Sequence, residues 1–212
     1  MKLQGNQMTF EITGKLQRTL SAENWYHATT FSNYKNILAT GVKADYNIGS
    51  ELDFGYGFYL TTTENLAESY IARLQTWNND SDVADMPVIM EYKINPLEIF
   101  NDANFNSMMF PKFDCDFAEF VFKNRINCNT KKQQHSYDII YGVMSDSKPT
   151  KLLLSYRVGD ITKDEVIAEL QKDNRMKQLS LHNQGLCDKL ILSRAYLFNP
   201  ETEERKELNI HE

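Results

Sequence analysis

The sequence is poor in cysteine and contains no long hydrophobic run. Its three cysteines, Cys115, Cys128 and Cys187, are widely spaced and odd in number, and no Cys-x-x-Cys pair or Cys/His cluster occurs. We therefore expect neither a disulfide scaffold nor a metal site, but reduced thiols in a cytoplasmic protein. No stretch approaches the ~18 apolar residues of a membrane-spanning helix, and the first twenty residues lack the apolar segment of a signal peptide. A membrane partner is not expected.

An excess of positive charge is also absent. The chain has 29 acidic and 23 basic residues among 212, which gives a net charge of −6 at pH 7. This balance disfavours binding to nucleic acids or membranes by broad electrostatic attraction, although it is compatible with a local basic surface. The hydrophobic content of 42% is typical of a soluble globular protein, and the length is sufficient for a core of its own.

Internal repeats and a convincing domain linker are both missing. The polar segments 78–87 and 127–136 are predicted to be loops, and residues 200–212 to be a charged tail. We therefore expect a single domain over residues 1–212, with its core at about residues 24–193.

Short strand patterns alternate with helix patterns along the chain. The predicted strands are rich in β-branched and aromatic residues and are bounded by turn-forming residues; they lie at 24–30, 57–62, 87–95, 137–145, 178–184 and 186–193. The predicted helices have apolar residues at helical spacing; they lie at 32–40, 62–77, 116–125 and 163–173. No Gly-x-Gly-x-x-Gly follows a strand, so the chain is not a Rossmann fold. The order predicts an α+β domain built on a small mixed or split sheet with flanking helices.

Side chains that cap helices support the predicted ends of three of these helices. Ser32 is a candidate N-cap, and Gly41 a candidate C-terminal stop. Thr61 and Thr162 each precede a glutamate by three residues, which is the capping-box pattern.

Two segments combine polar and aromatic residues in a way that predicts a ligand site. His27 lies at the polar end of the strand NWYHATT, where side chains commonly face a cleft, although a lone histidine in an apolar strand is more often a core residue. In DFGYGFYL, Gly55 and Gly57 alternate with aromatic residues. Glycines let a planar ligand approach the backbone and tyrosines stack on it, but a glycine turn entering an aromatic core strand has the same pattern. Tyr59 and Tyr70 are placed to meet at one cleft, although helix packing explains Tyr70 equally well.

Taken in order, these motifs resemble the ADP-ribosyltransferase superfamily, in its His-Tyr-Glu clade of diphtheria-type toxins and poly(ADP-ribose) polymerases. More narrowly, the chain resembles an uncharacterised group of bacterial toxin-like domains in that superfamily. The resemblance covers about residues 24–193, and its motifs are YHAT at 26–29, DFGYGFYLTT at 53–62, FVFKNR at 120–125, YDIIYG at 137–142 and NQ at 183–184. It implies an ADP-ribosyltransferase-like split mixed β-sheet with flanking helices, and NAD+ as a cosubstrate.

The resemblance also implies roles for individual residues. His27 would hydrogen-bond the adenosine ribose, and the backbone of Ala28 would hold the nicotinamide carboxamide, where the family usually has glycine. Tyr59 and Tyr70 would sandwich the nicotinamide ring. The cosubstrate-binding set expected in this way is His27, Ala28, Thr29, Gly57, Tyr59 and Tyr70.

The third motif residue departs from the family pattern. The superfamily usually places a glutamate at the start of the strand after the 163–173 helix, where it binds the ribose 2′-hydroxyl. The residue assigned to that place is Gln184, which can bond a hydroxyl but cannot act as a general base. Glu119 in the 116–125 helix is the alternative carboxylate, although a solvated or salt-bridged surface role is the default for such a residue. The expected catalytic set is Gln184, Glu119, His27 and Tyr59.

Other polar residues are expected to be structural or exposed. Arg125 is expected near Asp138, in a pair that would be structural or would bind pyrophosphate. Glu68 is expected on the solvent face of an amphipathic helix. His135 and His182 lie in or beside loops and need no function.

The resemblance favours an NAD+-dependent mono-ADP-ribosyltransferase that modifies a protein or nucleic-acid acceptor. It implies a toxin or defence effector in a bacterial cytoplasm, with a cognate antitoxin or immunity protein as a second partner. Two alternatives stay open. One is NAD+ hydrolysis without an acceptor, which Gln184 in place of glutamate allows because water needs less positioning than a macromolecule. The other is a catalytically inactive module that binds ADP-ribose or a protein.

Overall fold

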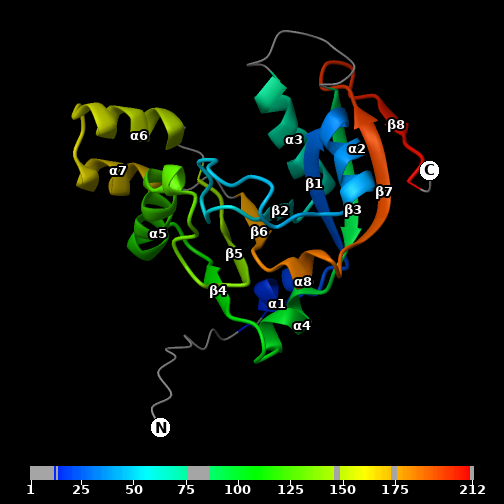
Figure 1. Ribbon diagram of the computed structural model, residues 1–212, viewed down its shortest axis with the longest axis horizontal. Helices are drawn as coiled ribbons and strands as arrows, with labels where there is room; N and C mark the ends of the chain where they lie inside the picture. Colours follow the sequence, from blue (N-terminus) through cyan, green and yellow to red (C-terminus); the bar gives the residue numbers. More distant parts are fainter. Residues whose placement is uncertain (1–11, 13, 76–85, 146–148, 173–175, 211–212) are drawn as a thin grey trace.

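One open sheet of eight strands organises the fold (Figure 1). The structure, a computed structural model, describes residues 12, 14–75, 86–145, 149–172 and 176–210. Its strands are β1 (Asn24–Thr30), β2 (Phe58–Thr61), β3 (Pro87–Lys93), β4 (Ser107–Phe110), β5 (Ile139–Val143), β6 (Lys177–Leu181), β7 (Ile191–Phe198) and β8 (Arg205–Glu207). They follow the order β4-β5-β6-β2-β1-β3-β7-β8; β4 and β5 pair in parallel, and every other neighbouring pair is antiparallel. The prediction of an α+β protein with a mixed sheet is confirmed.

Helices gather at both ends of this sheet. They are α1 (Gly14–Leu20), α2 (Phe31–Thr40), α3 (Glu64–Gln75), α4 (Pro96–Asn101), α5 (Cys115–Ile126), α6 (Pro149–Val158), α7 (Lys163–Leu170) and α8 (Gln184–Cys187). In Figure 1, α5, α6 and α7 lie beside the β4/β5 end, while α2 and α3 lie beside β1 and β3. Within the described ranges, no helix has the length and apolar character needed to span a membrane.

The alternation of side chains along the strands distributes the core over several clusters. In β3, Val88 and Met90 join the largest cluster, whereas Ile89 between them packs with Ile71 of α3 in a smaller one. This is the period of two that a strand imposes on its side chains. A third cluster, which includes Phe117 of α5, lies where α5, α6 and α7 cover β4 and β5.

The two halves of the sheet meet between β1 and β2, where the pairing is short. β1 pairs with β3 over its whole length, from Asn24 opposite Lys93 to Thr30 opposite Pro87. Its register with β2 is the pair Tyr26 and Thr61. This junction therefore has the shortest register of all strand pairs in the sheet among the described residues.

Several predicted element boundaries are confirmed. The strand 24–30 has the predicted bounds, and α5 begins one residue before the predicted helix 116–125. The capping box at Thr162 is present, with reciprocal bonds between Thr162 and Glu165. Gly41 ends α2, with φ +75° and its N–H donating to the carbonyl of Ile37.

Two predicted helix caps are wrong by two residues. Thr30, not Ser32, caps α2, because its side chain accepts a bond from the backbone N–H of Asn33. Thr63, not Thr61, accepts a bond from the N–H of Leu66 at the start of α3. In both cases the turn begins at a different threonine or serine of the same short run, so the sequence alone does not identify the capping residue.

The C-terminal third departs further from prediction. The predicted strand 178–184 ends at Leu181, and the residues predicted as the start of the next strand form α8, which Asn183 caps by accepting a bond from the N–H of Gly185. The predicted charged tail, 200–212, contains β8, which pairs with β7. Most of the predicted loop 78–87 lies outside the described residues, and Pro87 begins β3. The predicted loop 127–136 contains one short 3-10 helix, Cys128–Thr130.

Candidate functional site

A cavity of about 320 Å³ lies at the junction of β1 and β2. Residues of α2, α3, the loop before β2, the end of α5 and the start of β6 complete its wall. Ligand pockets in proteins typically measure ~300–1,000 Å³. The cavity therefore has room for a small ring system with a sugar, or for the corresponding part of a larger ligand.

The cavity collects the residues that the sequence motifs singled out. The lining includes all six predicted cosubstrate-binding residues: His27, Ala28, Thr29, Gly57, Tyr59 and Tyr70. His27 and Tyr59 lie on neighbouring strands and both line the cavity, but the pairing of Tyr26 with Thr61 places their side chains on opposite faces of the sheet. The expectation that both side chains face the cleft from one side of the sheet is therefore wrong. The two side chains approach it differently, because the ring of His27 stacks on Phe58 while the ring of Tyr59 stacks on Phe54.

His27 belongs both to the cavity wall and to the packing of the sheet. Its Nδ1 lies 2.8 Å from the carbonyl oxygen of Tyr59, and its ring centroid lies 4.3 Å from that of Phe58. A carbonyl oxygen only accepts hydrogen bonds, so Nδ1 carries the proton of the neutral ring. Burial lowers the pKa of His27 to about 4, against the opposing effect of the bond to Tyr59. At neutral pH the ring is therefore uncharged, and Nε2 is a hydrogen-bond acceptor.

The hydroxyl of Tyr59 fastens the glycine-rich turn that precedes β2. It donates to the carbonyl of Gly55 at 2.6 Å and accepts a bond from the N–H of Phe54 at 3.1 Å. Gly55 has φ +77°, a conformation that glycine adopts readily and other residues rarely. Burial raises the pKa of Tyr59 well above its ordinary value, so the hydroxyl stays protonated.

Two histidines that had no expected function hold the same turn. His135 Nε2 lies 2.7 Å from the carbonyl oxygen of Phe54, and its Nδ1 accepts a bond from the N–H of Tyr137. His182 Nδ1 lies 2.7 Å from the carbonyl oxygen of Tyr56. Burial, followed by the neighbouring His135, lowers the pKa of His182 to about 3. Both rings are thus neutral donors to the turn, which is a structural role.

Asn47 also stabilises this turn, through two hydrogen bonds to the backbone of Gly57. Its side-chain amide donates to the carbonyl of Gly57 at 2.8 Å and accepts from the N–H of Gly57 at 2.9 Å. The backbone of Gly57 is therefore already satisfied. A side chain at Gly57 would also collide with the ring of His182, since a Cβ there would lie 2.6 Å from its Nδ1.

A buried ion pair forms another part of the cavity wall. Arg125 binds Asp53 through Nε at 2.8 Å and through Nη2 at 2.7 Å, and both residues line the cavity. Asp53 also accepts bonds from Ser145 and Gln178. The expected proximity of Arg125 to Asp138 is wrong, because the carboxylate of Asp138 instead binds the backbone N–H of Asn106 and the side chain of Asn183.

The two residues proposed for the third motif position lie elsewhere. Gln184 begins α8, and its amide bonds the carbonyl of Val42, the N–H of Ala44 and the carboxylate of Asp188. These bonds fix the chain between α2 and β2. Glu119 is 46% exposed and forms an ion pair with Lys163. Neither residue lines the cavity, and the expectation that Gln184 opens a late strand is wrong.

Gln178 occupies the place where the third residue was expected. It is the second residue of β6, the strand that follows α7, and it lines the cavity with 4% of its surface exposed. The predicted strand 178–184 already began at this glutamine. The sequence pattern therefore placed Gln178 at the start of a strand, but the assignment followed the resemblance at Asn183-Gln184 instead.

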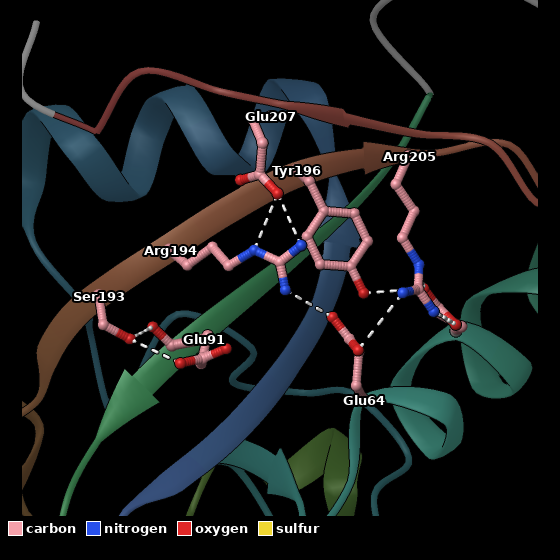
Figure 2. A network of polar contacts seen from close by, with 8 residues as sticks. Glu64, Glu91, Ser193, Arg194, Tyr196, Arg205 and Glu207 are labelled. Carbon is pink, nitrogen blue, oxygen red and sulfur yellow. Dashed lines mark hydrogen bonds and ion pairs between the residues drawn. The ribbon is translucent and has the colours of Figure 1, made fainter.

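A polar network fastens α3, which carries Tyr70, to the last two strands (Figure 2). Arg194 of β7 binds Glu64 at 2.8 Å, and Arg205 of β8 binds Glu68 at 2.7 Å. The hydroxyl of Tyr196 donates to Glu68 at 2.8 Å. Glu68 is buried, so its predicted position on the solvent face of the helix is wrong. Tyr70, on the same helix, is 37% exposed at the cavity mouth.

Comparisons with known proteins identify a family without an assigned activity. Among the described residues, no group of three or more histidines, cysteines and carboxylates is arranged to hold a metal ion. No curated protein and no solved structure matches the chain. The family described as a protein of unknown function (DUF3990) matches residues 40–191, which is more than half of the chain, and the match does not by itself indicate an ADP-ribosyltransferase. The chain therefore belongs to this uncharacterised family.

Proposed function

We propose that this protein binds NAD+ in the cavity between β1 and β2 and transfers the ADP-ribose group to a protein or nucleic-acid acceptor. One observation carries the proposal. Six residues chosen from sequence motifs, between His27 and Tyr70, line the same cavity. Pairing of β1 with β2 brings five of them together, and Tyr70 joins them from α3.

The size and the chemistry of the cavity wall support binding of the nicotinamide end of NAD+. A volume of about 320 Å³ suits nicotinamide with its ribose, and the rest of the dinucleotide would extend through the open side. Tyr59 and Tyr70 offer aromatic faces, and stacking on such faces contributes ~0.5–1.5 kcal/mol beyond burial. The unprotonated Nε2 of His27 offers an acceptor to a ribose hydroxyl.

The proposed reaction begins with heterolysis of the bond between ribose C1′ and the nicotinamide nitrogen. The bonding electron pair leaves with the nicotinamide, which becomes neutral, and the ribose is left with an oxocarbenium character. The acceptor then donates an electron pair to C1′ and loses its proton. Polar groups held near the ribose stabilise such a cation-like transition state.

We reassign the third motif position from Gln184 to Gln178. Gln178 is the second residue of the strand that follows α7, and it lines the cavity, whereas Gln184 and Glu119 do not. A glutamine oxygen accepts a bond from a ribose 2′-hydroxyl, but an amide cannot remove a proton at neutral pH. An acceptor that is nucleophilic without a general base would suit such a site.

A hydrolase or a binding module is the second candidate. Among the described residues that line the cavity, Asp53 is the only carboxylate, and Arg125 pairs with it. The cavity wall therefore holds no carboxylate free to activate an acceptor. This composition favours NAD+ hydrolysis, or binding without catalysis, over transfer to a weakly nucleophilic acceptor.

Incubation of the protein with NAD+ labelled in the adenosine half, with and without cell lysate, separates these functions. Transfer predicts release of nicotinamide and label on a macromolecule. Hydrolysis predicts release of nicotinamide with free ADP-ribose, and a binding module predicts a shift in melting temperature without release. No binding and no release would contradict the proposal.

A role as a toxin or defence effector in a bacterial cytoplasm, restrained by an antitoxin or immunity protein, extends this proposal. Its test is growth of a bacterial host during expression. The wild-type chain should slow growth, and Gln178→Ala should not, while Gln184→Ala serves as a matched glutamine variant outside the cavity. Equal growth with the wild type and Gln178→Ala would contradict the toxin role.

A further inference from the structure

Asp53 and Gln178 form a close contact in the cavity wall. The Oδ2 atom of Asp53 lies 2.8 Å from Nε2 of Gln178, and the two residues are 3% and 4% exposed. The same Nε2 lies 3.3 Å from the carbonyl oxygen of Val143. The nitrogen end of this amide thus faces two acceptors, one of them charged.

We propose that Asp53 locks the side-chain amide of Gln178 in one orientation, so that the cavity presents an uncharged acceptor, Oε1, and excludes a carboxylate at position 178. Rotation of the amide by half a turn would place Oε1 against the carboxylate of Asp53 and the carbonyl of Val143. Acceptors that face each other at such distances repel each other and lose the donor that Gln178 supplied, and an unsatisfied buried polar group costs ~1–3 kcal/mol. The orientation of Gln178 follows from this chemistry.

Asp53 can act as a lock because it is itself held from several sides. Oδ1 accepts bonds from Arg125 Nε at 2.8 Å and from the hydroxyl of Ser145 at 2.5 Å. Oδ2 accepts a bond from the backbone N–H of Ser145 at 2.9 Å, in addition to the one from Gln178. A carboxylate with both oxygens engaged in this way cannot turn away from Gln178 without losing several bonds at once.

The other end of the amide is available to a ligand. No described donor bonds Oε1 of Gln178, and this atom is not among the four fully buried side-chain oxygens without a partner, on Asn24, Glu51, Ser107 and Asn124. Because Gln178 lines the cavity, Oε1 is placed to accept a bond from a hydroxyl. The identification of that hydroxyl with a ribose rests on the proposed function; the lock itself does not.

Charged and titratable groups around the pair leave this conclusion unchanged near neutral pH. Arg125 offsets the charge of Asp53, and Glu51 is paired with Arg157 at 2.6 Å. Burial raises the pKa of both Tyr59 and Tyr70, so their hydroxyls stay neutral. The other titratable side chains that line the cavity are His27, which is neutral, and Tyr26, Lys43 and Tyr46.

The first test exchanges the amide for a carboxylate and reads stability against pH. In Gln178→Glu, two carboxylates share the contact, so the folded-state pKa of the pair rises above the unfolded value. Stability is then retained at low pH and lost as pH rises through that higher pKa. We expect a melting temperature at pH 8 about 5 °C or more below that of the wild type, and less than half of this deficit at pH 5.

Two further variants make this signature specific. The double variant Asp53→Asn/Gln178→Glu restores one amide and one carboxylate to the contact, so its stability relative to the wild type should no longer change between pH 5 and pH 8. Gln171→Glu introduces the same charge at a glutamine whose amide, among the described residues, bonds only the carbonyl of Ile167, and should also lack the pH-dependent deficit. A deficit of Gln178→Glu that is equal at pH 5 and pH 8, or that survives in the double variant, would overturn the lock.

The second test reads ligand binding, with NAD+ and ADP-ribose as the probes. In Asp53→Asn the amide of Gln178 is free to turn its N–H groups to the cavity, and the affinity for either probe should fall at least ~10-fold. Asp138→Asn is the matched control, because Asp138 also accepts an amide bond, from Asn183 at 2.8 Å, but does not line the cavity. Its affinity should stay within about twofold of the wild type.

The stability test and the binding test can fail independently of each other. A wild-type protein that binds neither probe, combined with the expected pH signature of Gln178→Glu, would contradict the proposed function and leave the lock intact. Binding of NAD+ that is unaffected by Asp53→Asn would overturn the lock as a determinant of the site, whatever the activity of the wild type.

Discussion

The Nδ1 atom of His27 lies 2.8 Å from the backbone carbonyl oxygen of Tyr59, next to the point where β1 and β2 pair through Tyr26 and Thr61. The side chain of His27 therefore makes a hydrogen bond to β2 at a place where a longer strand pairing would supply hydrogen bonds between backbone groups. The same ring stacks on Phe58 and lines the cavity. His27 therefore links the stability of the sheet junction to the geometry of the candidate site.

Substitution of His27 should affect both the stability of the sheet junction and the geometry of the candidate site. His27→Ala removes a partly buried hydrogen bond and a stacked ring, and we expect a loss of ~1–3 kcal/mol in the free energy of unfolding, measured by urea denaturation. Asn36→Ala, which changes the cavity wall at an exposed residue of α2, is the control and should lose under ~0.5 kcal/mol. A fully stable His27→Ala would show that the contact with Tyr59 contributes nothing to the sheet junction.

The neutral histidines predict a loss of stability in mild acid. Burial lowers the pKa of His27 to about 4 and of His182 to about 3, and it also lowers the pKa of His135. The unfolded chain binds protons at these residues below about pH 6.5, whereas the folded protein does not. Stability is thus complete above pH 6.5 and falls as the pH drops towards the folded-state values, by at most ~1.4 kcal/mol per pH unit for each histidine.

Urea denaturation between pH 7 and pH 5 measures this dependence, in a range where carboxylates are mostly ionised in the unfolded chain. His182→Gln should reduce the slope by up to one proton. A slope that is the same in the wild type and in this variant would mean that His182 is already protonated in the folded protein.

The hydroxyls of Tyr59 and Tyr70, two of the tyrosines that line the cavity, should differ in their effect on stability. Tyr59→Phe leaves the carbonyl of Gly55 and the N–H of Phe54 without their partner, so we expect a loss of ~1–3 kcal/mol. Tyr70→Phe is the matched control, since the hydroxyl of Tyr70 bonds no group among the described residues, and its loss should be near zero. Thermal unfolding of the two variants side by side decides the point, and equal losses would contradict it.

The third-position assignment predicts a clear order of activities. Gln178→Ala should lower nicotinamide release from NAD+ by ~10²–10³, as removal of a preorganised transition-state contact typically does. Gln184→Ala should unfold at a lower temperature but keep its turnover when folded, because its amide bonds the chain between α2 and β2. Glu119→Ala should keep at least about half of the activity, as exposed substitutions usually perturb a protein little. An active Gln178→Ala with an inactive Glu119→Ala would return the third position to α5.

Two glutamates with ion pairs should contribute very differently to stability: Glu68, which bonds Tyr196 and Arg205 of the network in Figure 2, and Glu119, which lies outside it. Glu68→Ala removes the acceptor of the buried Tyr196 hydroxyl and leaves Arg205 with only its 3.5 Å ion pair to Glu64 among the described residues, so we expect a loss of ~2–4 kcal/mol. Glu119→Ala breaks the exposed pair with Lys163 and should lose under ~1 kcal/mol. Urea denaturation measures both, and a small loss for Glu68→Ala would show that β8 is not held to α3 by this carboxylate.

The local patterns in the sequence were sufficient for the elements that carry most of the cavity. β1, α2, β2, α3 and α5 combine clear strand or helix periodicity with polar side chains near their starts, and these features act over a few residues. The same patterns identified His27, Tyr59 and Tyr70 as candidates. The predictions missed α1, α4, α6, α8, β4 and β8. For α8 and β8 the reason is length, because a four-residue helix and a three-residue strand have too few residues to express a period.

Amino-acid order alone determined the class of the fold, the strong elements and the set of side chains that could form a site. Only the tertiary structure decided which glutamine faces the cavity, because Gln178 and Gln184 have the same chemistry and lie six residues apart. It also decided that Asp53 pairs with Arg125 and Gln178, and that His135 and His182 hold the turn before β2. These partners are separated by 72 to 126 residues. Their contacts depend on how the strands assemble into one sheet, and no local pattern encodes a hydrogen bond between such distant residues.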